Sequence, residues 1–90
     1  MGHIIHDTSK LVARLRRIKG QVEGVERSLE TCAECTEILR QIASIRGAMT
    51  GLTIEVLKEH LRSHIVKATD DTSREKAAEE MIQILQSYLK

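Results

Sequence analysis

Two cysteines and four histidines are the side chains of this sequence best suited to bind a transition metal. They are His3, His6, Cys32, Cys35, His60 and His64. His60 and His64 are four residues apart, which puts both imidazoles on one helix face within reach of one metal ion. Two surface histidines would show the same spacing. The glutamate that follows the first histidine in zinc proteases is absent, because Leu61 stands there.

Cys35 can join this histidine pair only from a second chain. A helix predicted over about residues 32–66 places Cys35 about 37 Å from His60 along its axis. Ligands of one metal ion lie within about 4 Å of each other. An antiparallel partner helix, related by a two-fold axis near residues 48–49, brings Cys35 of one chain to His60 and His64 of the other. The sequence therefore predicts an antiparallel dimer with two identical bridging sites.

The predicted ligand set is one thiolate and several nitrogens. Cys35, His60 and His64 form it, and His3 with the terminal amine can supply further nitrogen. Such a set suits Ni(II), Co(II) or Zn(II). We expect His6 to lie in a frayed terminus. Cys32 is expected to be an auxiliary thiol, because one C-x-x-C pair is a weak indication of zinc, and a redox motif would need a βαβ context.

Three helices must position these residues. Apolar residues recur at alternating steps of four and three in two segments, as in helices that pack side by side. The first seam is Leu11, Leu15, Ile18, Val22, Val25 and Leu29. The second seam is Ile38, Ile42, Ile45, Met49, Leu52 and Val56. A third helix carries a predicted stripe of Ala78, Met81, Leu85 and Tyr88 and ends near Lys90.

Polar residues and glycines mark where these helices begin and where they pack closely. Asp7 and Thr8 are good N-caps for the first helix. The pairs Thr31 with Glu34 and Thr72 with Glu75 match the capping box and predict the starts of the second and third helices. Two glycine pairs, Gly20 with Gly24 and Gly47 with Gly51, have i,i+4 spacing inside the predicted helices. We expect another helix to approach closely at each pair; tolerated glycines are the plainer alternative.

The composition favours an all-α chain that needs partners. The 90 residues are 41% hydrophobic but include one aromatic residue and no proline, so a monomeric core would be thin. No apolar run approaches the roughly 20 residues that span a bilayer, and no signal peptide follows Met1. The sequence predicts a single cytoplasmic domain over residues 1–90. It shows no acid/base pair in a plausible pocket and no nucleotide-binding loop, which argues against an enzyme.

Basic residues are concentrated between Thr8 and Val22, a stretch without acidic residues. They are Lys10, Arg14, Arg16, Arg17 and Lys19. Lys10, Arg14 and Arg17 form a stripe beside the first apolar seam. The stripe is explained either by a solvated helix face or by a surface for DNA phosphates, which an oligomer would present several times. Stacking on single strands is not expected, since aromatic residues are missing.

Four stretches resemble the CsoR/RcnR family of bacterial repressors, which respond to copper, to nickel or cobalt, or to formaldehyde. They are Arg14-Leu-Arg-Arg-Ile-Lys-Gly-Gln21, Cys35, Gln41-Ile-Ala-Ser-Ile-Arg-Gly-Ala48 and His60-Leu-Arg-Ser-His64. The resemblance implies a three-helix protomer, an antiparallel dimer with a four-helix-bundle core, and a disc-shaped tetramer made of two dimers. It also implies operator binding without a helix-turn-helix.

The resemblance further implies roles for individual residues. The inducer positions fall on His3, Cys35, His60 and His64, a set similar to that of the nickel/cobalt branch. The family's DNA contacts fall on Arg14, Arg16 and Lys19, and the basic stripe adds Lys10 and Arg17. Two features depart from the nickel/cobalt branch: Ser63 stands where that branch has glutamate, and Cys32 is an additional thiol.

We therefore expect a repressor that binds double-stranded operator DNA in the apo state. Binding of Ni(II) or Co(II), with Zn(II) a further candidate, would release it and derepress a metal efflux gene. One alternative is a formaldehyde-responsive repressor, in which formaldehyde cross-links Cys35 to the N-terminal amine. The other is a helical metal-binding protein with no DNA role.

Overall fold

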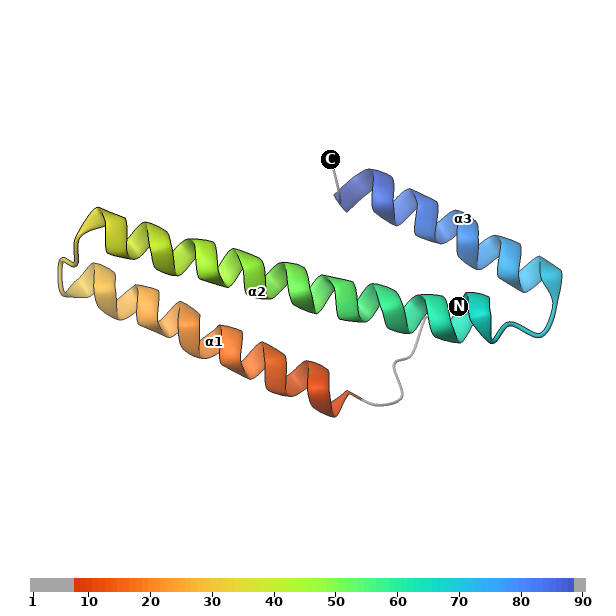
Figure 1. The fold of residues 1–90 in the computed structure, drawn as a ribbon, viewed down its shortest axis with the longest axis horizontal. Coiled ribbons are helices and arrows are strands. Elements are labelled where there is room, and N and C mark those ends of the chain that lie inside the picture. The colour runs from red at the N-terminus through yellow and green to blue at the C-terminus, as the bar shows by residue number, and fades with distance from the viewer. Residues whose placement is uncertain (1–7, 89–90) are drawn as a thin grey trace. The chain divides into compact units, whose positions relative to one another are not determined.

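The computed structural model describes residues 8–88, and all the regular structure in this range is helical (Figure 1). The elements are α1 (Ser9–Glu30), α2 (Cys35–Leu61), the π-helix η1 (Arg62–Val66) and α3 (Asp71–Tyr88). The all-α prediction is confirmed. The described residues fall into two compact units, within residues 8–56 and 57–88. Among the described residues, no helix combines the length and apolar character that crossing a membrane requires.

Within residues 8–56, α1 and α2 form an antiparallel hairpin (Figure 1). Two side-chain hydrogen bonds define its register. Gln21 Nε2 donates to Ser44 Oγ at 3.1 Å, and Gln41 Nε2 donates to Ser28 Oγ at 2.9 Å. Because the later residue of α1 pairs with the earlier residue of α2, the two helices run in opposite directions.

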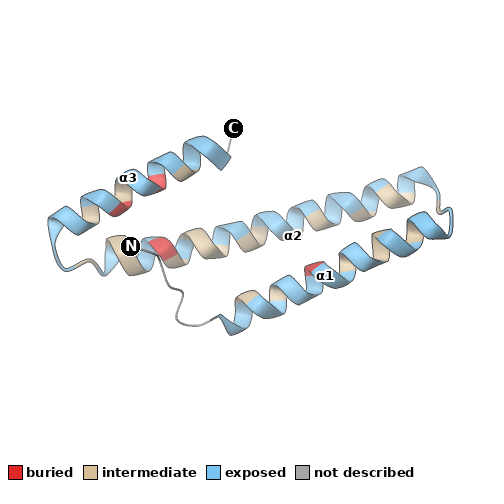
Figure 2. Cartoon of the chain, turned by 180° about the vertical axis from the view of Figure 1, so that it is seen from behind, coloured by how far each residue is buried: buried red, intermediate tan, exposed pale blue. Residues whose placement is uncertain are grey.

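Burial alternates along the two apolar seams of the hairpin. Ile18 is only 4% exposed, whereas Leu15 and Val22, one step away on either side, are both 51% exposed. Ile42 and Met49 on α2 are exposed in the same way, and buried residues are sparse along all the helices (Figure 2). One set of seam positions therefore faces the neighbouring helix, while the other forms an apolar face that a single hairpin leaves uncovered.

The turn between α1 and α2 differs from the predicted capping box. Thr31 ends α1 as its C-cap, and its hydroxyl donates to the Arg27 carbonyl oxygen at 2.9 Å. Cys32 follows with a left-handed backbone, φ 59°, as is common just after a helix C-terminus. α2 then begins at Cys35, later than predicted, and the Glu34 carbonyl accepts the first N–H groups of its initial turn.

The glycines do not meet a closely packed helix within one chain. A Cβ built at Gly20 or Gly47 would have no non-local atom within 4 Å. At Gly24 the nearest such atom belongs to Arg27 of the same helix, and at Gly51 it belongs to the Arg14 guanidinium. Close helix packing at these positions would therefore require a second chain.

Within residues 57–88, α3 packs against η1. The Arg74 guanidinium ties α3 to the segment that precedes it, because it donates to the carbonyl oxygens of Ile65 at 3.1 Å and Ala68 at 2.9 Å. The buried apolar residues of α3 are Ala77 and Met81, at 7% and 6% exposure.

The predicted stripe of α3 is wrong in its orientation. Met81 is buried as expected, but Ala77 is more buried than Ala78, and Leu85 and Tyr88 are 40% and 76% exposed. The packed face is rotated by about one residue from the predicted one.

The cap of α3 is Asp70 rather than the predicted Thr72. The Asp70 carboxylate accepts the Ser73 backbone N–H at 2.9 Å, and this hydrogen bond is the main reason why the pKa of Asp70 lies below its ordinary value. A carboxyl group with a lowered folded-state pKa stabilises the fold above its unfolded pKa, near pH 4, and loses that effect as the pH falls through the folded value.

We therefore expect Asp70→Ala to lower the melting temperature at pH 7, with a difference from wild type that shrinks as the pH falls below about 4. Thermal melts followed by circular dichroism at several pH values measure this difference. Thr72→Ala is the matched control and should melt like wild type. An equal loss in Thr72→Ala would contradict the assignment of the cap.

Candidate metal centre and DNA-binding surface

The structure brings two of the predicted metal ligands together within residues 57–88. His60, near the end of α2, is 9% exposed, and His64, within η1, is half-buried. Their ring centroids are 5.1 Å apart, and the ring planes are inclined by 36°. The α-helix changes to a π-helix between these residues, a local change often found at functional sites. Two histidines one helical turn apart can supply two nitrogen ligands to one metal ion.

The residue that departs from the nickel/cobalt branch lies beside this pair. Ser63 Oγ donates to Glu59 Oε1 at 3.0 Å, one turn back along the chain. Both residues are half-buried. Glu59 thus accepts a hydrogen bond from Ser63, but within the described residues it does not join His60 and His64 in a group of three that could hold a metal.

Cys35 is the first residue of α2, and its side chain is exposed. Neither Cys35 nor Cys32 forms a disulfide. α2 is continuous from Cys35 to Leu61, so Cys35 and His60 occupy opposite ends of one helix. The described part of one chain accordingly contains no group of three His, Cys, Asp or Glu side chains that could hold a metal. The candidates His3 and His6 lie outside the described residues, as does the predicted cap Asp7.

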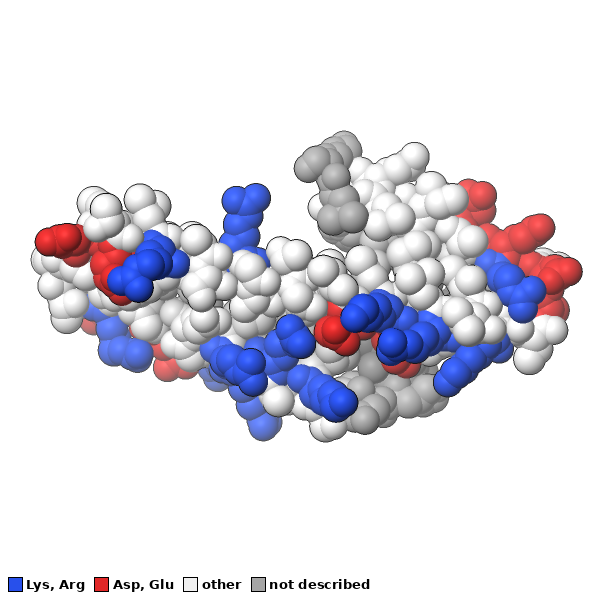
Figure 3. Space-filling model, viewed as in Figure 1, with Lys and Arg blue, Asp and Glu red and all other residues white. Residues whose placement is uncertain are grey.

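All five predicted DNA-binding residues lie on α1. Lysine and arginine side chains gather over the N-terminal half of this helix (Figure 3). Lys10, Arg14 and Arg17 line one pocket of about 280 Å³, together with Glu55 of α2. Arg16 and Lys19 do not line it and are exposed. The structure thus brings together the three residues of the predicted stripe.

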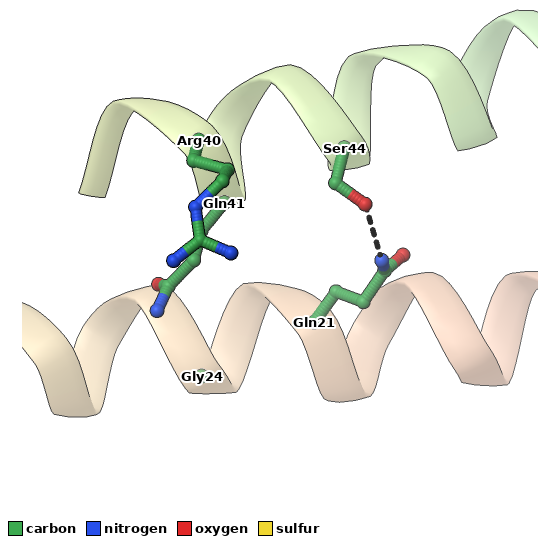
Figure 4. Close-up of a pocket in the computed structure, with 5 residues that line it drawn as sticks. All are labelled: Gln21, Gly24, Arg40, Gln41 and Ser44. Carbon is green, nitrogen blue, oxygen red and sulfur yellow. Dashed lines mark hydrogen bonds between the residues drawn. The ribbon is translucent and has the colours of Figure 1, made fainter. Parts of the chain in front are cut away.

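The heptad pattern does not predict the polar cluster that lies between α1 and α2. Gln21, Gly24, Arg40, Gln41 and Ser44 line a pocket of about 290 Å³ (Figure 4). The Oε1 atoms of Gln21 and Gln41 are buried there without a hydrogen-bond partner. Both glutamines and Ser44 belong to the stretches that carry the family resemblance. That resemblance is the sequence feature that could have pointed to this cluster. Their structural effect is to hold α1 and α2 in register.

A family model for metal-sensitive transcriptional repressors matches residues 7–87. This chain belongs to that family. The chain is 46% identical over 90 residues to the transcriptional repressor RcnR of Citrobacter koseri, and the match covers all of both sequences.

Two solved structures resemble this repressor. A variant of the formaldehyde-responsive regulator FrmR from Salmonella enterica serovar Typhimurium has a TM-score of 0.83 and 39% identity, over 97% of this chain and 99% of that chain. The Cu(I)-bound copper-sensing repressor CsoR from Geobacillus thermodenitrificans has a TM-score of 0.86 and 28% identity, over 100% of this chain and 94% of that chain.

The family establishes the general function. This repressor binds DNA and regulates transcription in response to a metal ion, and it is not an enzyme. The expected family and the general function of a metal-responsive repressor are therefore confirmed. Membership of a repressor family argues against the alternative of a metal-binding protein without a DNA role.

Proposed function

We propose that this repressor senses Ni(II) or Co(II) at a site shared between two chains. Cys35 of one chain would bind the ion together with His60 and His64 of another, and His3 would add nitrogen. The observation that supports this proposal is the division of the ligands: two imidazoles are paired at one end of α2, and the thiol lies at its other end. One thiolate with several nitrogens suits Ni(II) and Co(II), and also Zn(II).

The uncovered apolar face of the α1–α2 hairpin favours the second chain that this site needs. Val22, Val25, Leu29, Ile42 and Ile45 border a groove of about 540 Å³ on this face. An exposed apolar patch of this kind commonly marks an interface. A second hairpin laid antiparallel on it would complete a four-helix bundle, and two such dimers would form the tetramer implied by the family resemblance.

The DNA-binding surface follows from the basic residues of α1. A tetramer would present Lys10, Arg14, Arg16, Arg17 and Lys19 four times, and phosphate contacts from each copy add to the affinity. We infer that the apo tetramer holds operator DNA through these residues. Since the partner is DNA, the cytoplasm is the expected compartment.

Metal binding would lower the DNA affinity because the ion would link Cys35 of one chain to His60 and His64 of another. Closure of the site ties the start of α2 in one chain to the end of α2 in another, and recruitment of His3 draws in the segment that precedes α1. The basic surfaces of α1 then lose their register with the phosphates. A coupling of about 1–3 kcal/mol is sufficient for such a switch.

The direct test is fluorescence anisotropy of the apo protein on DNA from upstream of its own gene, followed by titration with Ni(II). We expect DNA release to be complete at about one nickel per chain, which is the stoichiometry of two bridging sites per dimer. Co(II) and Zn(II) titrations rank the metals. DNA binding that is unaffected by all three ions would contradict the nickel/cobalt proposal.

Formaldehyde is the second candidate inducer, because Cys35 is exposed and one structural neighbour is a formaldehyde-responsive regulator. The Cys35 thiolate would attack formaldehyde, and the N-terminal amine would then displace water to leave a methylene bridge. Mass spectrometry would show a gain of about 12 Da per cross-link, because one carbon is added net. DNA release by formaldehyde with this mass gain would identify formaldehyde as an inducer in addition to the metal ion.

A further inference from the structure

We propose that Gly51 positions Arg14, so that the pocket between α1 and α2 binds a phosphodiester group of the DNA backbone. This inference rests on the proposed DNA-binding surface of α1. Arg14 is half-buried, unlike the other basic residues of the same helix, which are all exposed. Its guanidinium reaches across the hairpin to α2, where a Cβ built at Gly51 would lie 2.8 Å from Nη1 and 4.0 Å from Cζ.

The glycine at position 51 is explained by the missing Cβ rather than by backbone freedom. No described glycine has a positive φ, so an alanine could adopt the backbone of Gly51 without strain. Glycine inside a helix is less stable than alanine. Its benefit here is space, because an alanine methyl at this position would overlap the place now taken by the Arg14 guanidinium.

The surrounding pocket has the charge and size for one phosphate. Lys10, Arg14 and Arg17 contribute three positive charges, and Glu55 contributes one negative charge, around about 280 Å³. A guanidinium can hold two phosphate oxygens at once through its planar fork of N–H groups. A guanidinium already held against α2 loses less side-chain freedom when the phosphate arrives than one extended into water.

Gly51→Ala is the variant that tests this inference. Since the atom that must move is the far end of a flexible side chain, the fold should be kept, and the melting temperature should be unchanged or higher. The affinity for operator DNA should fall about tenfold, the effect of losing one charge-assisted contact. The slope of log K against log salt should decrease in magnitude by about one.

Gly47→Ala is the matched control. Gly47 is one turn away on the same helix, and a Cβ there has no atom within 4 Å, so the variant gains the same helix propensity without touching Arg14. We expect its DNA affinity to equal that of wild type. Light scattering on both variants checks that the number of chains in the assembly is unchanged. A different mass for Gly51→Ala would assign this glycine to a contact between chains and overturn the inference.

A double-mutant cycle shows whether Gly51 acts through Arg14. Arg14→Ala should weaken DNA binding, and adding Gly51→Ala to it should have no further effect. If Arg14→Ala weakens binding while Gly51→Ala binds DNA like wild type, the role of Gly51 is overturned and the DNA-binding surface stands. If Arg14→Ala itself binds DNA like wild type, the phosphate pocket and the proposed contribution of Arg14 to the DNA-binding surface both fail.

Discussion

Replacing Cys35 with alanine is expected to abolish the response to nickel while leaving apo DNA binding intact. The thiol is the proposed link between one chain and the histidine pair of another. Without it the metal retains His60 and His64, which belong to one chain and cannot join two. Cys35 is exposed at the start of α2 and lines none of the basic pocket on α1, so the substitution should affect neither folding nor phosphate contacts.

Anisotropy of bound operator DNA during a Ni(II) titration measures this effect, and loss of thiolate-to-nickel charge-transfer absorption reports the ligand directly. Cys32→Ala is the matched control, because it removes the other exposed thiol of the same turn and leaves the left-handed backbone as it is. We expect Cys32→Ala to keep its response. Release of DNA from Cys35→Ala at one nickel per chain would show that the metal site is assigned to the wrong residues.

Replacing Ile18 with alanine is expected to destabilise the protein by about 2–4 kcal/mol. Ile18 is 4% exposed and is the only buried hydrophobic residue in the described part of the α1–α2 hairpin. Its removal leaves a cavity between two helices whose other contacts are half-buried seam residues and two glutamine–serine hydrogen bonds. Because so few side chains are buried in the hairpin, its neighbours cannot move in to fill the cavity.

Urea unfolding at one fixed protein concentration measures this loss, since the stability of an oligomer depends on concentration. Val12→Ala is the control: Val12 lies on α1 outside the heptad seam and is 37% exposed, so it should lose less than about 1 kcal/mol. An Ile18→Ala variant as stable as Val12→Ala would mean that the hairpin is held together mainly by its contacts with other chains.

The sequence by itself determined the features that depend on local periodicity and covalent spacing. The alternating steps of four and three residues located α1 and α2, because a helix brings every third or fourth side chain to one face. The spacing of His60 and His64 likewise predicted that their rings would lie close together. The run of basic residues located the charged side of α1, and the four family-like stretches identified the family.

The tertiary structure alone decided which faces and ends of these helices make contacts. Ile18 is buried whereas Leu15 is exposed, and Ala77 lies on the buried face of α3. Thr31 and Asp70 cap helix ends that the sequence assigned differently. The Arg14 guanidinium lies over Gly51. These outcomes depend on which surfaces meet across the hairpin or against η1. A periodic pattern marks two neighbouring seam positions equally, and only the packing of a second helix buries one of them and leaves the other exposed.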